Sequence, residues 1–144
     1  MKRKIDRFLR RSLVVLPLVA GISVGLTLPA EAASGGSTGT GVRASYSWTW
    51  SRTAITGISA TVYDTACDNN DVYGYIRLYD VAGVIANGSQ QRWSGGCNTS
   101  GGFTLSGLRF SNSRTIAVIR IFACVDDAGG DSCWYSGDYA NPYR

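Results

Sequence analysis

The chain has 144 residues, with 14 Lys and Arg against 10 Asp and Glu, a formal net charge of +4, four Cys and no His. This length is enough for one domain with one hydrophobic core. The absence of His excludes a Ser–His–Asp triad, a Cys–His dyad and an imidazole metal ligand, so hydrolase mechanisms that depend on these groups are not available to this protein.

Residues 1–32 are predicted to be a secretory signal peptide that is not part of the fold. A front with six Lys and Arg precedes an apolar run over 12–28, and an Ala-Glu-Ala triplet ending at Ala32 supplies the small residues at a cleavage site. The run is short for a membrane anchor, and it contains Pro17 and Gly21. We therefore expect cleavage after Ala32 and a secreted, extracellular mature form with no membrane partner.

The charge of the mature chain differs from that of the whole sequence. Residues 33–144 contain 8 Arg and 8 Asp, with no Lys and no Glu. The basic balance therefore belongs to the signal peptide, and a nucleic-acid partner is not expected. The same residues include 16 Gly, all 8 Tyr and all 4 Trp, which favours strands over helices.

All four Cys lie in the mature chain, and an even number in a small exported protein predicts two disulfides. Three connectivities can be written. We favour Cys67–Cys97 with Cys124–Cys133, because the second pair is local and flanks a single turn. With no C-x-x-C pair and no His, neither a zinc site nor any other cofactor is expected.

Residues 33–43 are predicted to be a flexible Gly/Ser/Thr-rich arm, ahead of a β domain over 44–144. One interpretation is a disordered spacer. The other is an arm that becomes ordered on a partner. In that case Val42 and Arg43 would be the first side chains of the arm large enough to make specific contacts with a partner.

The remainder predicts an all-β fold, a small antiparallel sandwich of about seven short strands, with a barrel as the related alternative. Turn-forming residues separate segments of alternating polarity. The run over 114–125 is apolar on both faces, which is typical of a central strand. The other expected strands cover 45–51, 55–63, 72–80, 84–85 with 90–93, 103–110 and 133–139.

One face of the 72–80 strand is a candidate partner-binding surface. It carries Tyr73, Tyr75, Arg77 and Tyr79, and Tyr and Arg are enriched at protein interfaces. Aromatic rings also suit sugar stacking, for which the candidates are Tyr73, Tyr75 and Trp93. The plainer alternative is that another part of the protein covers this stripe. A second aromatic set is more typical of core; it consists of Tyr46, Trp48 and Trp50.

Two Asp-rich loops could have a role or could simply be turns. The loop over 64–71 offers oxygen ligands for calcium, but it lacks the EF-hand spacing, and Asp and Asn are ordinary turn residues. The turn between Cys124 and Cys133 resembles the disulfide-closed loops of protease inhibitors, although its Asp, Ala and Gly are not residues that common proteases favour. A glycosidase using Asp64 or Asp71 opposite Asp126 or Asp131 would need a long groove. No catalytic residue is expected.

Four segments occur in a fixed order: Tyr63-Asp-Thr-Ala-Cys-Asp68, Val72-Tyr-Gly-Tyr75, Ile119-Arg-Ile-Phe-Ala-Cys-Val-Asp-Asp127 and Asp131-Ser-Cys133. Together they resemble a group of small secreted actinobacterial proteins. The chain is similar in size and plan to the small adaptor subunits of umbrella-toxin particles, over about residues 60–135. The resemblance implies a secreted β domain that joins two other subunits, partly through an extended N-terminal arm, with no catalytic residue.

We therefore expect a secreted, non-enzymatic adaptor or structural module of an extracellular assembly, with another secreted protein as its partner. A carbohydrate-binding module that uses the Tyr, Arg and Trp surface is the first alternative. A secreted inhibitor is the second.

Overall fold

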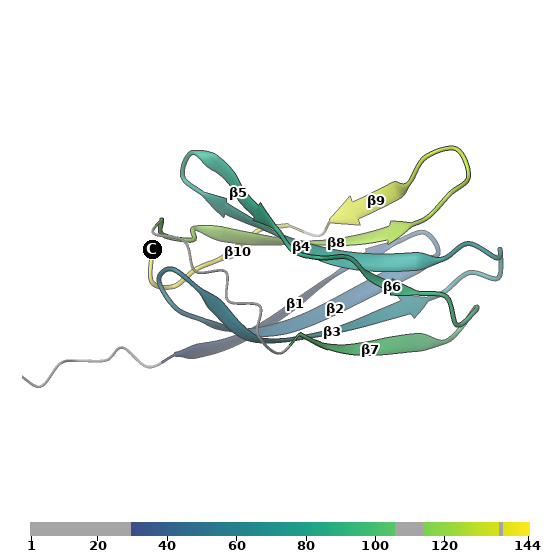
Figure 1. The fold of residues 1–144 in the computed structure, drawn as a ribbon, viewed down its shortest axis with the longest axis horizontal. Helices are drawn as coiled ribbons and strands as arrows, with labels where there is room; N and C mark the ends of the chain where they lie inside the picture. The colour runs from purple at the N-terminus through teal and green to yellow at the C-terminus, as the bar shows by residue number, and fades with distance from the viewer. Residues whose placement is uncertain (1–29, 106–113, 136) are drawn as a thin grey trace, which may run out of the picture.

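The computed structural model describes residues 30–105, 114–135 and 137–144, and these residues form an all-β molecule (Figure 1). The expected antiparallel β-sandwich is confirmed, but it has ten strands where about seven were expected. The strands are β1 (Glu31–Gly39), β2 (Val42–Trp50), β3 (Ile55–Asp64), β4 (Val72–Asp80), β5 (Gly83–Asn87), β6 (Gln91–Trp93), β7 (Ser100–Leu105), β8 (Val118–Val125), β9 (Ser132–Tyr135) and β10 (Tyr139–Ala140).

The strands lie in two sheets, which Figure 1 shows as two layers. The first has the order β1-β2-β3-β7. The second has the order β10-β8-β4-β5, with β6 also paired to β4 and β9 also paired to β8. Strand β8 therefore has neighbours on both sides, which confirms the expected central strand, although the strand begins at Val118 and not at residue 114.

The inward faces of the two sheets form one hydrophobic core. The aromatic set of β2 lies within it, since Tyr46, Trp48 and Trp50 are 2–3 % exposed. Ile76 of β4 and Ile121 of β8 meet them from the second sheet. Each large apolar side chain buried in this way contributes on the order of 1.5–3 kcal/mol.

Both expected disulfides are present. Cys67–Cys97 joins the loop after β3 to the loop before β7. It closes a separation of 30 residues, which in the chain-entropy account stabilises the fold by roughly 3–4 kcal/mol. Cys124–Cys133 joins facing positions of β8 and β9.

The segment expected to be a flexible arm is a strand, so the prediction for 33–43 is corrected. Strand β1 pairs with β2 along its whole length, from Glu31 opposite Trp50 to Gly39 opposite Val42. The two-residue turn between them contains Gly41 with φ of 83°, a left-handed value that glycine adopts without strain. Residues 1–29 of the predicted signal peptide lie outside the described residues. Cleavage after Ala32 would leave most of β1 in place.

The small residues of β1 allow rings of the second sheet to approach its backbone. A side chain at Gly35 would overlap the Tyr139 ring, and one at Gly39 would overlap the Trp134 ring. The Tyr139 hydroxyl donates to the Gly36 carbonyl (2.9 Å) and accepts from the Gly36 amide (2.8 Å). The glycines that suggested a flexible arm therefore allow close packing between β1 and the rings of the second sheet.

Gly39→Ala tests this account. We expect the free energy of unfolding to fall by about 1–3 kcal/mol, because the new methyl group must displace the Trp134 ring from a packed position. Urea denaturation of the disulfide-intact protein measures the change. The control is Gly102→Ala on strand β7, where no atom lies within 4 Å of the added carbon. Equal unfolding midpoints for the two variants would contradict the packing account.

Candidate partner-binding face

The outward side chains of the second sheet form a continuous set of rings and guanidinium groups. The register places Tyr75 opposite Phe122 and Arg77 opposite Arg120. Neighbouring strands extend these rows, because β9 pairs with β8 and β6 pairs with β4. We call this set the aromatic–arginine face. Its members are Tyr73, Tyr75, Arg77, Tyr79, Arg92, Arg120, Phe122 and Tyr135.

The rings of this face stack against one another and against the arginines. Tyr75 and Phe122 are parallel within 2°, with centroids 4.7 Å apart, and Tyr73 stacks on Tyr75 at 6.3 Å. The Arg77 guanidinium lies 4.9 Å from the Phe122 centroid, and that of Arg120 lies 4.5 Å from the Tyr79 centroid. Such cation–π contacts contribute roughly 0.5–1 kcal/mol each at exposed sites. The side chains are therefore held in place before any partner arrives.

Carboxylates neutralise two of the three arginines. Arg120 binds Asp138, with Nε to Oδ1 at 2.5 Å, and Arg92 binds Asp126. The hydrogen bond from Arg120 is the main cause that lowers the pKa of Asp138. Arg77 instead donates from Nε to the amide oxygen of Asn87 at 2.7 Å.

A shallow hollow of about 260 Å³ adjoins Arg77 on this face. In Figure 1 the β4–β5 and β8–β9 hairpins rise at opposite ends of the second sheet, on the side away from the first sheet. Exposed apolar groups lie nearby, since Tyr135 is 53 % exposed and Val84, opposite Tyr79, is 52 % exposed. The hollow is lined by Tyr73, Tyr75, Arg77, Asn87, Gly88 and Gln90.

The predicted partner-binding residues have different surroundings. Tyr75, Arg77 and Tyr79 are partly exposed on the face as expected, whereas Tyr73 is only 3 % exposed and supports its neighbours from below. The other two are elsewhere. Val42 is fully buried in the core, and Arg43 lies on the first sheet, over the Tyr63 ring at 5.1 Å.

Sequence reasoning did not assign four members of the face: Arg92, Arg120, Phe122 and Tyr135. The alternation along 114–125 does put Arg120 and Phe122 on one side of their strand. The alternation does not show that this strand pairs with β4. That pairing places Arg120 and Phe122 beside Tyr75 and Arg77.

The three rings proposed for sugar stacking do not converge. Trp93 stands opposite Val72, and therefore points toward the core side of the sheet, away from Tyr75. Its indole nitrogen donates to the Thr99 hydroxyl at 3.0 Å, and Gly101 lies against its ring. This geometry does not favour the carbohydrate-binding alternative.

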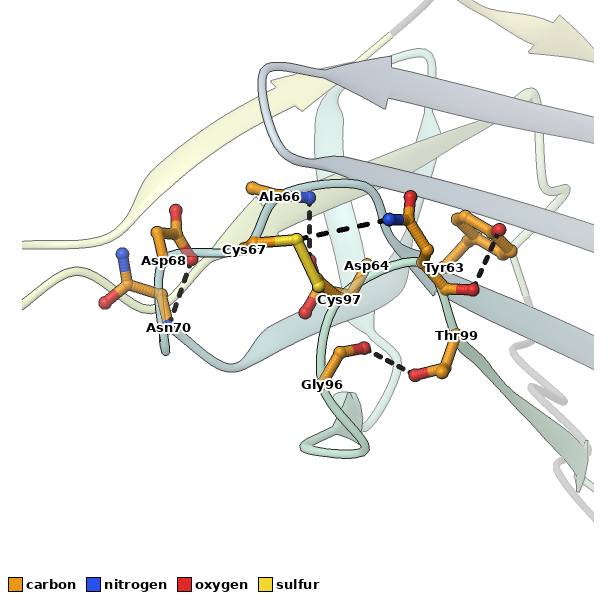
Figure 2. The surroundings of a disulfide bond; sticks show 10 residues. Tyr63, Asp64, Ala66, Cys67, Asp68, Asn70, Gly96, Cys97 and Thr99 are labelled. Atoms are coloured by element: carbon orange, nitrogen blue, oxygen red, sulfur yellow. Dashed lines mark hydrogen bonds between the residues drawn. A yellow bond between two sulfur atoms is a disulfide. The ribbon is translucent and has the colours of Figure 1, made fainter.

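The acidic loop over 64–71 has the hydrogen bonds of a turn. Asp64 accepts a bond from the Ala66 amide at 2.9 Å, and Asp68 accepts one from the Asn70 amide at 3.1 Å. Figure 2 shows Asp68 and Asn70 on one side of the disulfide that anchors this loop. Within the described residues, no three His, Cys, Asp or Glu side chains are grouped so that they could hold a metal ion.

The loop between β8 and β9 is tied to the domain. Asp126 binds Arg92, and Asp131 accepts a hydrogen bond from the Tyr73 hydroxyl at 2.5 Å. Asp71 also approaches Arg92, at 3.6 Å, so Asp71 and Asp126, two of the four carboxylates considered for a glycosidase pair, contact one guanidinium. The bonds that hold this loop against the domain do not favour a presented inhibitor loop.

Fold and site together define a small, two-disulfide antiparallel β-sandwich with a preformed aromatic–arginine face. In comparisons with known proteins, no family model, no curated protein and no solved structure matches the chain. In the part of the chain that the structure describes, there is no helix long and apolar enough to cross a membrane.

The Tyr73 phenol gives a prediction for alkaline pH. Burial and the hydrogen bond to Asp131 raise the pKa of Tyr73 to about 12, from 10.0. The folded state therefore holds this proton more tightly than the unfolded state, so the stabilisation is intact below pH 10.0 and is lost as the pH rises toward about 12. We expect Tyr73→Phe to weaken this loss, measured as urea unfolding midpoints across that range.

The control for this experiment is Tyr135→Phe, which removes the hydroxyl of an exposed ring and should reproduce the wild-type pH dependence. Burial also raises the pKa of Tyr46, so part of the alkaline destabilisation should persist in Tyr73→Phe. A Tyr73→Phe protein with the full wild-type dependence would show that the Tyr73 phenol does not contribute.

Proposed function

We propose that the protein is a secreted, non-enzymatic module that binds another protein through the aromatic–arginine face, as an adaptor or structural component of an extracellular assembly. The observation that carries this proposal is the concentration of Tyr, Phe and Arg on one face, next to exposed Val84 and Tyr135. Interfaces are enriched in aromatic residues and Arg, and a few such anchors supply most of the binding energy.

The order within the face supports this proposal. Binding normally costs about 0.5–1.5 kcal/mol for each flexible side chain that becomes immobilised. Here Tyr75 is stacked on Phe122, and Arg120 is fixed between the Tyr79 and Tyr135 rings and Asp138. Because these side chains are already ordered in the free protein, binding a partner requires little further loss of side-chain entropy.

The non-enzymatic part of the proposal rests on the state of the nearby carboxylates. Asp126 and Asp138 each bind an arginine, and Asp131 binds the Tyr73 hydroxyl. A general acid or base must reach a substrate proton, whereas these groups are engaged within the protein.

From the resemblance described above, we further propose that the assembly is a toxin particle of the umbrella type. The contact that we propose differs from the one expected of an N-terminal arm. Strand β1 is paired with β2 and packed against Tyr139, so the partner would dock on the aromatic–arginine face.

Tyr135→Ser tests the proposal. We expect it to reduce capture of the partner from culture supernatant by about tenfold or more, because an exposed aromatic anchor typically contributes more than about 1.4 kcal/mol. The measurement is quantitative mass spectrometry of the proteins retained by the tagged full chain, secreted and disulfide-bonded.

The matched control is Val81→Ser, which removes an apolar side chain that is 100 % exposed at the β4–β5 turn. Capture by this variant should equal that of the wild type. If the wild type retains no protein, or if Tyr135→Ser retains as much as the wild type, the proposed function is wrong.

A further inference from the structure

Arg77 differs from the other arginines of the aromatic–arginine face because no carboxylate of the described residues pairs with it. Arg92 and Arg120 each bind at least one Asp, whereas Arg77 donates to two neutral groups, from Nε to the amide oxygen of Asn87 at 2.7 Å and from Nη2 to the Tyr75 hydroxyl at 3.4 Å. Arg77 also stands directly opposite Arg120. Like charges in facing positions of a sheet repel unless they are neutralised. One positive charge on the face thus remains uncompensated.

The orientation of Arg77 leaves part of its guanidinium available to a ligand. Nε donates to Asn87 at 2.7 Å, Nη2 donates to the Tyr75 hydroxyl at 3.4 Å, and Cζ lies 4.9 Å from the Phe122 ring centroid. Guanidinium has five N–H donors, so three N–H groups on the terminal nitrogens remain to approach a carboxylate. Because the group is already fixed by stacking and by one hydrogen bond, little further ordering is needed to bind a carboxylate.

The surroundings of Arg77 favour a negatively charged, acceptor-rich group. Apart from Arg77 itself, the hollow of about 260 Å³ is lined by neutral residues, so no negative charge in its lining repels an anion. The guanidinium is therefore the one charged group that a ligand in this hollow would meet among the lining residues.

We propose that Arg77 is a binding site for a carboxylate, contributed by an Asp or Glu side chain of the partner protein that sits in the hollow beside Asn87. A protein source is favoured over a free acid because the same face exposes Val84 and Tyr135, which an acidic segment with apolar neighbours would cover. The inference rests on the proposed function and specifies the chemistry of the partner at that site.

A peptide-display selection tests the site without knowledge of the partner. The baits are the full chain, secreted and disulfide-bonded, as wild type, Arg77→Met and Arg43→Met. Arg43 is the matched control, since it is also exposed and lies over a Tyr ring at 5.1 Å, but on the other sheet. We expect peptides selected on wild type and on Arg43→Met to share an Asp or Glu beside an apolar residue, and this preference to disappear on Arg77→Met.

A second measurement begins with a comparison on the wild type, which does not depend on how well a variant folds. One selected peptide is synthesised with its acidic residue and with the matching Asn or Gln, and both are titrated against the wild type by calorimetry. Loss of the carboxylate should weaken binding by roughly 10- to 100-fold, as expected for a hydrogen bond between charged groups. On Arg77→Met the two peptides should bind alike.

The failures of the two proposals can be told apart. Peptides that need Tyr135 but show no acidic preference, or that keep this preference on Arg77→Met, overturn the carboxylate site and leave the protein-binding face standing. If no selected peptide depends on any residue of the face, and the wild type retains no protein from culture supernatant, both proposals fail.

Discussion

The pairing of β4 with β8 is the constraint on which the rest of the structure depends. Ile76 faces Ile121 on the core side, and Tyr75 faces Phe122 on the outer side. A shift of one residue would exchange the two sides of a strand, so burial of the isoleucines fixes the register that aligns the rings and arginines outside. The hydrophobic core thus determines the geometry of a surface with which it shares no side chain.

Charge on the outer face is arranged by the elements that flank this pair. Asp138 comes from the segment before β10 and Asp126 from the turn after β8, and each neutralises an arginine of the central region. The disulfide between Cys124 and Cys133 keeps β9 beside β8, which positions Tyr135 next to Phe122. The segments that supply Asp126 and Asp138 therefore determine that, among the arginines of the face, it is Arg77 that has no carboxylate partner in the described residues.

Much of this could be predicted from the sequence, because the signals were local. Alternating polarity placed β4 at 72–80 and the β2 aromatics in the core, and Cys spacing indicated the pairing. The rest depended on contacts between distant residues. Glycine looks the same in a loose linker and in a strand packed under a ring, so β1 was taken for an arm and Val42 for an exposed residue. Trp93 lies on a strand of three residues, too short for alternation to show its direction.

The bonds between Tyr139 and Gly36 span 103 positions of the chain. The free edge of β1 is therefore covered at Gly36 only after residues much later in the chain have folded. Topologies that rely on such distant contacts fold slowly, and an uncovered strand border is a template for pairing with a second molecule. By occupying the amide and the carbonyl of Gly36, Tyr139 removes two backbone groups of this edge to which a strand of another copy could bind.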